Sequence, residues 1–307
     1  MIANFFNKTK PINTLFIIVF LFCVYLVSLL LNLNDEFSLF ILFKRGFYFF
    51  LLLTMLFLIN FIVRKNNLSK DNSYTILLFV FLIGMFPLSM LDFELIVANL
   101  LLLLGYRRIY SLRTNKDTKK KLFDSAFWIG IATLIYPWSS IIIVLIYIAI
   151  FLYDKTTWRN ILMPIIGFIT PIFIFISYLV AIGNFDLFSS IINFNYSFTF
   201  ENYNSFNIII PLSLICALII WSIFPTTYKI TTINNEFKTS WLLLIFHLII
   251  LIPVIILSPL KDSSELLFLF FPTALIFTNY LQIVEEKWFK EVFLYTFLGI
   301  IGLVYIL

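Results

Sequence analysis

The sequence predicts an all-α polytopic membrane protein, a transmembrane helix bundle of about eleven spans. Hydrophobic residues make up 62% of its 307 positions and charged residues 12%, against about 25% charged residues in an average soluble domain. The mean hydropathy of +1.04 leaves no room for a separate soluble domain of about 100 residues. Apolar runs of about 17 to 25 residues, the length that crosses a bilayer, follow one another along the chain. We therefore expect one integral membrane domain over residues 1–307.

Six apolar segments fill the first half of the chain. We expect helices over 13–31, 46–63, 74–90, 95–106, 122–136 and 140–153. Polar or proline-containing turns separate them, namely 32–45, 64–72, 91–94, 107–121 and 137–139. The last three of these helices are short for a full crossing, because about 20 residues are needed to span the hydrocarbon core.

Five further apolar segments fill the second half. We expect helices over 161–182, 208–224, 241–257, 266–284 and 292–307. The connection 183–205 is the longest of the polar stretches between them. It has apolar residues at 185, 188, 191 and 192, a spacing that predicts a helix lying in the plane of the membrane.

The distribution of Lys and Arg predicts the orientation of the bundle. Seven of the 21 basic residues lie between Tyr106 and Phe123. If the N-terminus is cytoplasmic, 18 of the 21 fall in cytoplasmic segments and only Lys44, Arg45 and Lys261 fall outside. Because positive charge is retained on the cytoplasmic side, we expect a cytoplasmic N-terminus and an external C-terminus.

The sequence lacks the residue sets that several common classes of catalytic and metal-binding site require. His247 is the only histidine, and Cys23 and Cys216 lie in apolar runs, so we expect neither a transition-metal site nor a disulfide framework. We interpret His247 as a hydrogen-bonded packing residue. The sequence has no glycine-rich phosphate loop, no Ser-His-Asp set and no zinc-protease motif. No charged residue lies near the middle of an expected span, which argues against a proton- or ion-driven transporter.

Carboxylates on the expected external face are the remaining candidates for chemistry. Asp35 and Glu36 follow the first expected helix, and Asp92 and Glu94 lie in the turn after the third. Such oxygens can hold a divalent cation, or one of them can act as a base. The alternative is structural, since Asp at a helix N-terminus offsets the exposed N–H groups. Lys261 is a candidate contact for a lipid phosphate, with a pairing to Asp262 or Glu265 as its alternative.

Two resemblances bear on these residues. The runs KKKLFDSAFWIGIATLIYPWS, GFITPIFIF and KDSSELLFLFFPTALIFTNYL resemble an uncharacterised family of bacterial multi-pass inner-membrane proteins, over nearly the whole chain. Some members carry a name that implies carotene cleavage, a carotene monooxygenase. Membrane carotene oxygenases hold iron with several histidines, so we reject that activity for a chain whose only histidine is His247.

The layout is also similar to the GT-C class of membrane glycosyltransferases. Asn34-Asp35-Glu36 would match the first acidic motif of that class, Asp92 or Glu94 the second, and Lys261 with 266–273 the late basic element. The chain departs from the class because its first external loop is short and no external globular domain follows. The likeness is one of fold and layout.

We therefore expect a multi-pass protein of the bacterial inner (cytoplasmic) membrane that handles a lipid-linked sugar or envelope precursor at its external face. The GT-C resemblance implies a glycosyltransferase that depends on a polyprenyl-phosphate sugar. Asp35 is then the candidate base, Glu36, Asp92 and Glu94 are metal or acceptor contacts, and Lys261 contacts the lipid phosphate. A divalent cation is the only cofactor that this interpretation invokes.

Two alternatives stay open. The protein could be a non-catalytic membrane subunit or scaffold of an envelope complex, whose basic loop binds a membrane or cytoplasmic protein partner or anionic lipid. It could also be a lipid or small-molecule transporter, although the sequence shows no inverted repeat. Membrane lipid is an expected partner in every case, and nucleic acid in none, because we expect the basic loop to lie on the surface beside the bilayer.

Overall fold

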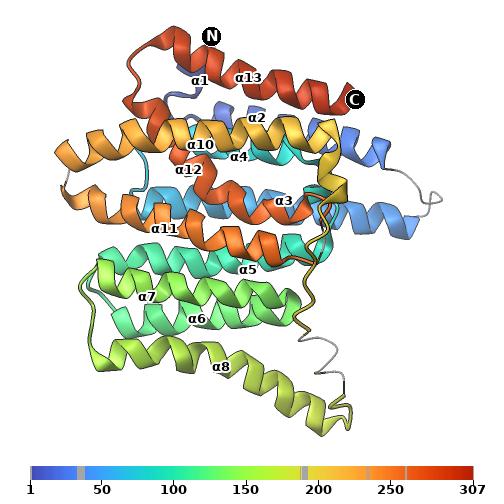
Figure 1. Cartoon of the computed structure of the whole chain (residues 1–307), viewed down its shortest axis with the longest axis vertical. Coiled ribbons are helices and arrows are strands. Elements are labelled where there is room, and N and C mark those ends of the chain that lie inside the picture. The colour runs from blue at the N-terminus through green and yellow to red at the C-terminus, as the bar shows by residue number, and fades with distance from the viewer. Residues whose placement is uncertain are drawn as a thin grey trace. The chain divides into compact units, whose positions relative to one another are not determined.

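A computed structural model describes residues 2–32, 39–186, 188, 193–233, 235–259 and 261–306, and these are largely helical (Figure 1). Within those ranges there is no β-strand, which confirms the all-α class. The chain divides into two compact units. The first unit comprises Met1–Ile96, Thr199–Lys238 and Leu260–Leu307, and the second comprises Val97–Phe198 and Thr239–Pro259.

Eight helices in the described part of the chain are long and apolar enough to cross a membrane. They lie within Pro11–Leu31, Leu39–Lys65, Phe93–Arg113, Trp158–Ala181, Phe206–Thr232, Phe237–Leu257, Ser264–Ile283 and Lys287–Ile306. The chain is therefore a multi-pass membrane protein, as its composition predicts. The number of spans, the side on which each terminus lies and the single domain over 1–307 stay predictions.

Two buried helices form the core of the first unit. Every residue of α4 (Tyr74–Met85) is buried, and α12 (Leu267–Ile283) packs along it with nearly all of its residues buried. A helix that is apolar on all sides needs neighbours on all sides. These are α2 (Pro11–Leu31), α3 (Leu39–Lys65) and α13 (Lys287–Ile306) around α4, and α10 (Phe206–Ile233) against α12 (Figure 1).

The short first helix, α1 (Ile2–Phe6), is fixed to the first unit by hydrogen bonds. The hydroxyl of Tyr74 donates to the carbonyl of Ala3 at 2.7 Å, and the Ala3 N–H donates to Glu291 Oε1 at 3.1 Å. The buried amide of Asn13 donates to the carbonyls of Phe5 and Lys8 at 2.8 and 2.7 Å. These hydrogen bonds satisfy backbone N–H and C=O groups of α1 and the turn after it, which would otherwise be unpaired in apolar surroundings.

The predicted helix over 74–90 is wrong in one respect, because Pro87 interrupts it. α4 ends at Met85, and Phe86 has left the helical region, with φ −129° and ψ 80°. A short 3-10 helix, η1 (Pro87–Met90), follows. The residue before a proline is driven out of the helical region by the proline ring.

The second unit repeats this arrangement at Pro137, where the sequence does predict a turn. α6 (Thr118–Ile135) ends before Tyr136, which is extended, with φ −132° and ψ 96°. The 3-10 helix η3 (Pro137–Ile142) then leads into α7 (Ile143–Leu152). The other helices of this unit are most of α5 (Phe93–Tyr110), α8 (Trp158–Ala181) and most of α11 (Asn235–Leu257).

Two glycines let α6 and α8 lie in close contact. A Cβ added at Gly167 would lie 2.5 Å from the carbonyl oxygen of Phe123, and one added at Gly130 would lie 2.6 Å from Cγ of Pro171. Small residues are the usual means by which membrane helices bring their backbones together.

Part of the basic loop is built into the second unit rather than lying on its surface. Lys121 is buried, and its ammonium donates to the carbonyls of Ser111 and Thr114 at 2.6 and 3.1 Å and to Oγ1 of Thr114 at 2.7 Å. Arg108 forms an ion pair with Asp124 at 2.7 Å. The expectation of a purely surface loop is therefore wrong for Lys121, because the turn leaves carbonyls that its ammonium satisfies.

The helices α8 and α10 present apolar surface to their surroundings. In each helix, only 17% of the most apolar 18-residue stretch is buried inside the protein. Apolar helices exposed in this way are suited to contact with lipid chains.

The in-plane helix expected near 185–192 falls largely on residues 187 and 189–192, which lie outside the described residues.

Candidate functional site

Three short 3-10 helices of the first unit carry the candidate site. They are η1 (Pro87–Met90), η4 (Glu201–Asn204) and η5 (Ser264–Leu266). η1 packs against η5, and the hydroxyl of Ser28 at the end of α2 donates to the carbonyl of Pro87 at 3.1 Å. We call Asp92, Tyr203, Lys261, Asp262 and Glu265, which these elements hold in place, the Lys261–Glu265 cluster.

The turn before α12 places Glu265 inside the protein. Asp262 accepts hydrogen bonds from the backbone N–H of Ser264 at 3.0 Å and from its hydroxyl at 2.5 Å. Ser263 has a left-handed backbone with φ 77°. An Asp side chain that accepts from the chain two residues later is a common way to start such a turn. Glu265 thus follows directly as part of η5, with its side chain turned inward.

Glu265 is a fully buried acid at the start of an apolar helix. Its side chain is 0% exposed, and Oε1 accepts a hydrogen bond from the hydroxyl of Tyr203 at 2.7 Å. Oε2 is also buried and has no hydrogen-bond partner in the part of the chain that the structure describes. A buried acceptor without a partner costs about 1–3 kcal/mol, and more if it is charged. A group kept at that cost points to a use beyond packing.

Lys261, which the sequence predicts to lie in an external segment, is buried beside this acid. It is 5% exposed, and its ammonium lies 5.0 Å from the centre of the Phe200 ring, a cation–π contact. Burial lowers the pKa of Lys261, and the negative charge of Glu265 opposes that shift. Both interpretations of Lys261, a contact for a lipid phosphate or a pairing with Asp262 or Glu265, stay predictions.

Asp92 belongs to the cluster, and Glu94 does not. Burial raises the pKa of Asp92, and the negative charge of Asp262 raises it further. The hydrogen bond that the Asp92 carboxylate accepts from the Leu95 N–H, at 3.0 Å, opposes this shift. Asp92 therefore both caps the start of α5 and lies within electrostatic range of Asp262. Glu94 is exposed at the start of the same helix. Asp35 and Glu36 lie outside the described residues.

His247 has the structural setting that the sequence predicts. It is buried in the second unit, its Nδ1 lies 3.0 Å from the hydroxyl of Tyr110, and its ring meets that of Tyr106 edge-on at 4.1 Å. Among the described residues, no group of three or more His, Cys, Asp or Glu side chains could hold a metal ion.

The comparisons with known proteins give a family for this chain. A model for a family of unknown function, DUF6427, matches residues 9–306. The chain belongs to DUF6427. No curated protein and no solved structure matches it.

The cluster in this DUF6427 chain combines three kinds of group that can act together in a transfer reaction that releases a phosphate. A buried carboxylate can accept a proton, an ammonium can attract a phosphate, and a tyrosine hydroxyl can orient the carboxylate. Glu265 and Tyr203 were missed as site residues from the sequence. The only sequence pattern that could have indicated Glu265 is a single acid directly before the apolar run 266–272. No sequence pattern indicates Tyr203 as a site residue.

Proposed function

We propose that this protein handles a lipid-linked sugar or a related envelope precursor at the Lys261–Glu265 cluster, as a glycosyltransferase of the bacterial inner membrane. One observation carries the proposal: Glu265, fully buried with one oxygen unpartnered among the described residues, lies in the electrostatic field of buried Lys261. Ionisable residues at the ends of membrane helices are costly to bury, and they commonly mark substrate sites.

The proposed reaction assigns a role to each group. The hydroxyl of an acceptor attacks the anomeric carbon of the sugar, and the bond from that carbon to the phosphate oxygen breaks. The acceptor proton passes to a carboxylate, for which Glu265 joins Asp35 as a candidate, and polyprenyl phosphate leaves. The ammonium of Lys261 stabilises the negative charge of the leaving phosphate. Asp92 then contacts the acceptor, and Glu36 stays a candidate contact for acceptor or cation.

The test is transfer from a labelled polyprenyl-phosphate sugar to short-chain alcohol and saccharide acceptors, with the purified full-length protein in lipid nanodiscs. The release of polyprenyl phosphate is followed by chromatography. Glu265→Gln and Lys261→Met should each lower the rate by about 100-fold or more, the usual effect of removing a group that moves protons or stabilises charge. Glu94→Gln, at an exposed carboxylate, is the matched control and should leave the rate unchanged.

Two outcomes would contradict the proposal. The first is release of polyprenyl phosphate at wild-type rate by folded Glu265→Gln and Lys261→Met proteins. The second is binding of the donor with no transfer to any acceptor, which would favour the non-catalytic subunit or the transporter.

A further inference from the structure

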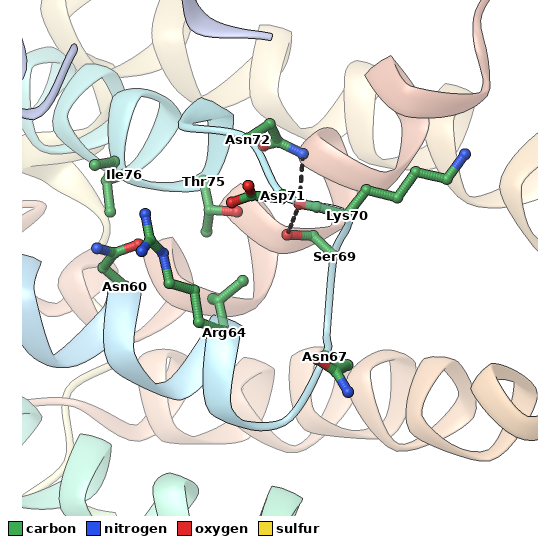
Figure 2. A pocket seen from close by; sticks show the side chains of 10 residues that line it. Asn60, Arg64, Asn67, Ser69, Lys70, Asp71, Asn72, Thr75 and Ile76 are labelled. Atoms are coloured by element: carbon green, nitrogen blue, oxygen red, sulfur yellow. Dashed lines mark hydrogen bonds between the residues drawn. The ribbon is translucent and has the colours of Figure 1, made fainter. Parts of the chain in front are cut away.

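A second polar site lies in the first unit, where α3 ends and α4 begins. A pocket of about 280 Å³ is formed by the last turns of α3, the connection 66–73 and the first turn of α4. Figure 2 shows Asn60, Arg64 and Thr75 around a common space, while the side chain of Lys70 extends away from it. From the sequence, residues 64–72 are expected only to form a polar turn between two helices.

The first turn of α4 leaves hydrogen-bond donors without partners at this pocket. The Tyr74 N–H is satisfied by Oδ1 of Asn72 at 3.0 Å, but the N-cap residue Ser73 makes no side-chain capping bond. In the described part of the chain, no acceptor is found for the N–H groups of Thr75 and Ile76, which both line the pocket. Such N–H groups carry the positive end of the helix dipole.

Thr75 is a second, independent observation that points to a ligand at this pocket. Its side chain is 4% exposed, and its Oγ1 is buried without a hydrogen-bond partner among the described residues. Thr75 lines the pocket, as Figure 2 shows. A buried hydroxyl without a partner costs about 1–3 kcal/mol, and an acceptor placed in the pocket would remove that cost.

The charges around the pocket favour an anion. Arg64 lines it and makes no ion pair within the described ranges, so its guanidinium is available for a ligand. Lys70 also lines the pocket, but its side chain extends away from it (Figure 2), so Arg64 is the cation that faces a ligand. Asp71 is the opposing charge, and one of its oxygens is engaged by the hydroxyl of Thr9. Arginine and a helix N-terminus together match the oxygens of a phosphate.

We propose that this pocket binds a phosphate group, held by Arg64, by the N–H groups of Thr75 and Ile76 and by the Thr75 hydroxyl. The predicted orientation places it at the cytoplasmic end of the bundle. Two sources share this chemistry there, a free phosphate or phosphate monoester and the headgroup of an anionic lipid. The proposal does not depend on transfer at the Lys261–Glu265 cluster.

The test measures the unfolding temperature of the purified full-length protein in nanodiscs. One arm adds inorganic phosphate to phosphatidylcholine nanodiscs, against chloride at equal ionic strength. The other arm replaces a tenth of the lipid by phosphatidic acid. Stabilisation by phosphate identifies a free phosphate ligand, and stabilisation by phosphatidic acid alone identifies a lipid headgroup.

Variants separate the pocket from general attraction of anions. Arg64→Gln should weaken the binding of the active ligand by about tenfold or more, because it removes a charge-assisted contact. Lys65→Gln removes an equal charge from the neighbouring exposed residue and should leave binding unchanged. Thr75→Val should weaken binding without lowering the stability of the ligand-free protein, because its hydroxyl has no partner to lose.

The proposal is overturned if neither probe stabilises the wild-type protein. It is also overturned if Arg64→Gln and Lys65→Gln weaken binding equally, because the effect would then be one of net charge. A loss of ligand-free stability in Thr75→Val would show that the hydroxyl has a structural partner instead.

Discussion

The ammonium of Lys121 satisfies the last carbonyls of the segment after α5, those of Ser111 and Thr114. Positive groups are favoured at this end of a helix, where unpaired carbonyls gather. Its neighbours Lys119 and Lys120 are exposed. Three consecutive lysines that look equivalent in the sequence therefore have different roles.

Lys121→Met should lower the free energy of unfolding by about 1–3 kcal/mol, because it removes the charge-assisted hydrogen bonds from the buried ammonium to Ser111 and Thr114. Lys120→Met is the matched control and should have no measurable effect. Unfolding of the purified protein in detergent, followed by circular dichroism, makes the comparison. Equal losses in the two variants would mean that charge, and not the hydrogen bonds, is what matters in this loop.

Asp92 gives a prediction for pH. Its pKa is raised in the folded protein, chiefly by burial, so the folded state holds the proton more tightly than the unfolded state does. Stability therefore falls as pH rises from the ordinary Asp pKa of 3.8 through the higher folded pKa. Asp92→Asn keeps an oxygen for the Leu95 N–H and removes the titration. The variant should gain stability relative to the wild type at pH 7 compared with pH 4, and a constant difference would refute the assignment.

At the scale of elements, the contact between α6 and α8 depends on the absence of two side chains. Gly167→Ala should lower stability by about 1–3 kcal/mol, because its Cβ would meet the backbone oxygen of Phe123. Gly299→Ala on α13 is the control, since no atom lies within 4 Å of its new Cβ. That variant should be equally or slightly more stable, as alanine favours helix over glycine by about 1 kcal/mol. The unfolding temperatures of both variants in detergent test the difference.

The same short motif, an aromatic residue followed by Pro, one residue and Ser, breaks a helix in each unit. The turn at Pro137 is predicted from the sequence, whereas the break at Pro87 is missed. The reason is that the residues after Pro87 stay apolar, so hydropathy alone continues the helix to Met90. Hydropathy reports burial in lipid, and backbone geometry is a separate signal carried by the proline.

The candidate site is predictable only in part, for a related reason. Lys261 and Asp92 stand out as charges between apolar runs, and the structure places both in one cluster. Buried Glu265 accepts a hydrogen bond from Tyr203, which lies far earlier in the chain and meets it only after folding. No local pattern carries that information. The proposed phosphate pocket could not be predicted from the sequence for the same reason. Its hydrogen-bond donors come together only when α3 and α4 are folded against each other.

For the whole molecule, orientation is the prediction to test first. With Cys23 and Cys216 replaced, single cysteines at Asn115 and Asn195 report opposite sides of the membrane. The split of 18 basic residues against three predicts that an impermeant thiol reagent labels position 195 in intact cells, and position 115 only after permeabilisation. Labelling of position 115 in intact cells, with none at 195, would reverse the predicted orientation.

The core of the first unit has a consequence for how the protein is made. α4 is buried on every side, and its main neighbour, α12, begins only at Leu267. During synthesis α4 therefore enters the bilayer surrounded by lipid and exchanges that lipid for protein only when α12 emerges from the ribosome. A ribosome that stops before Leu267 leaves a chain whose first unit lacks half of its core.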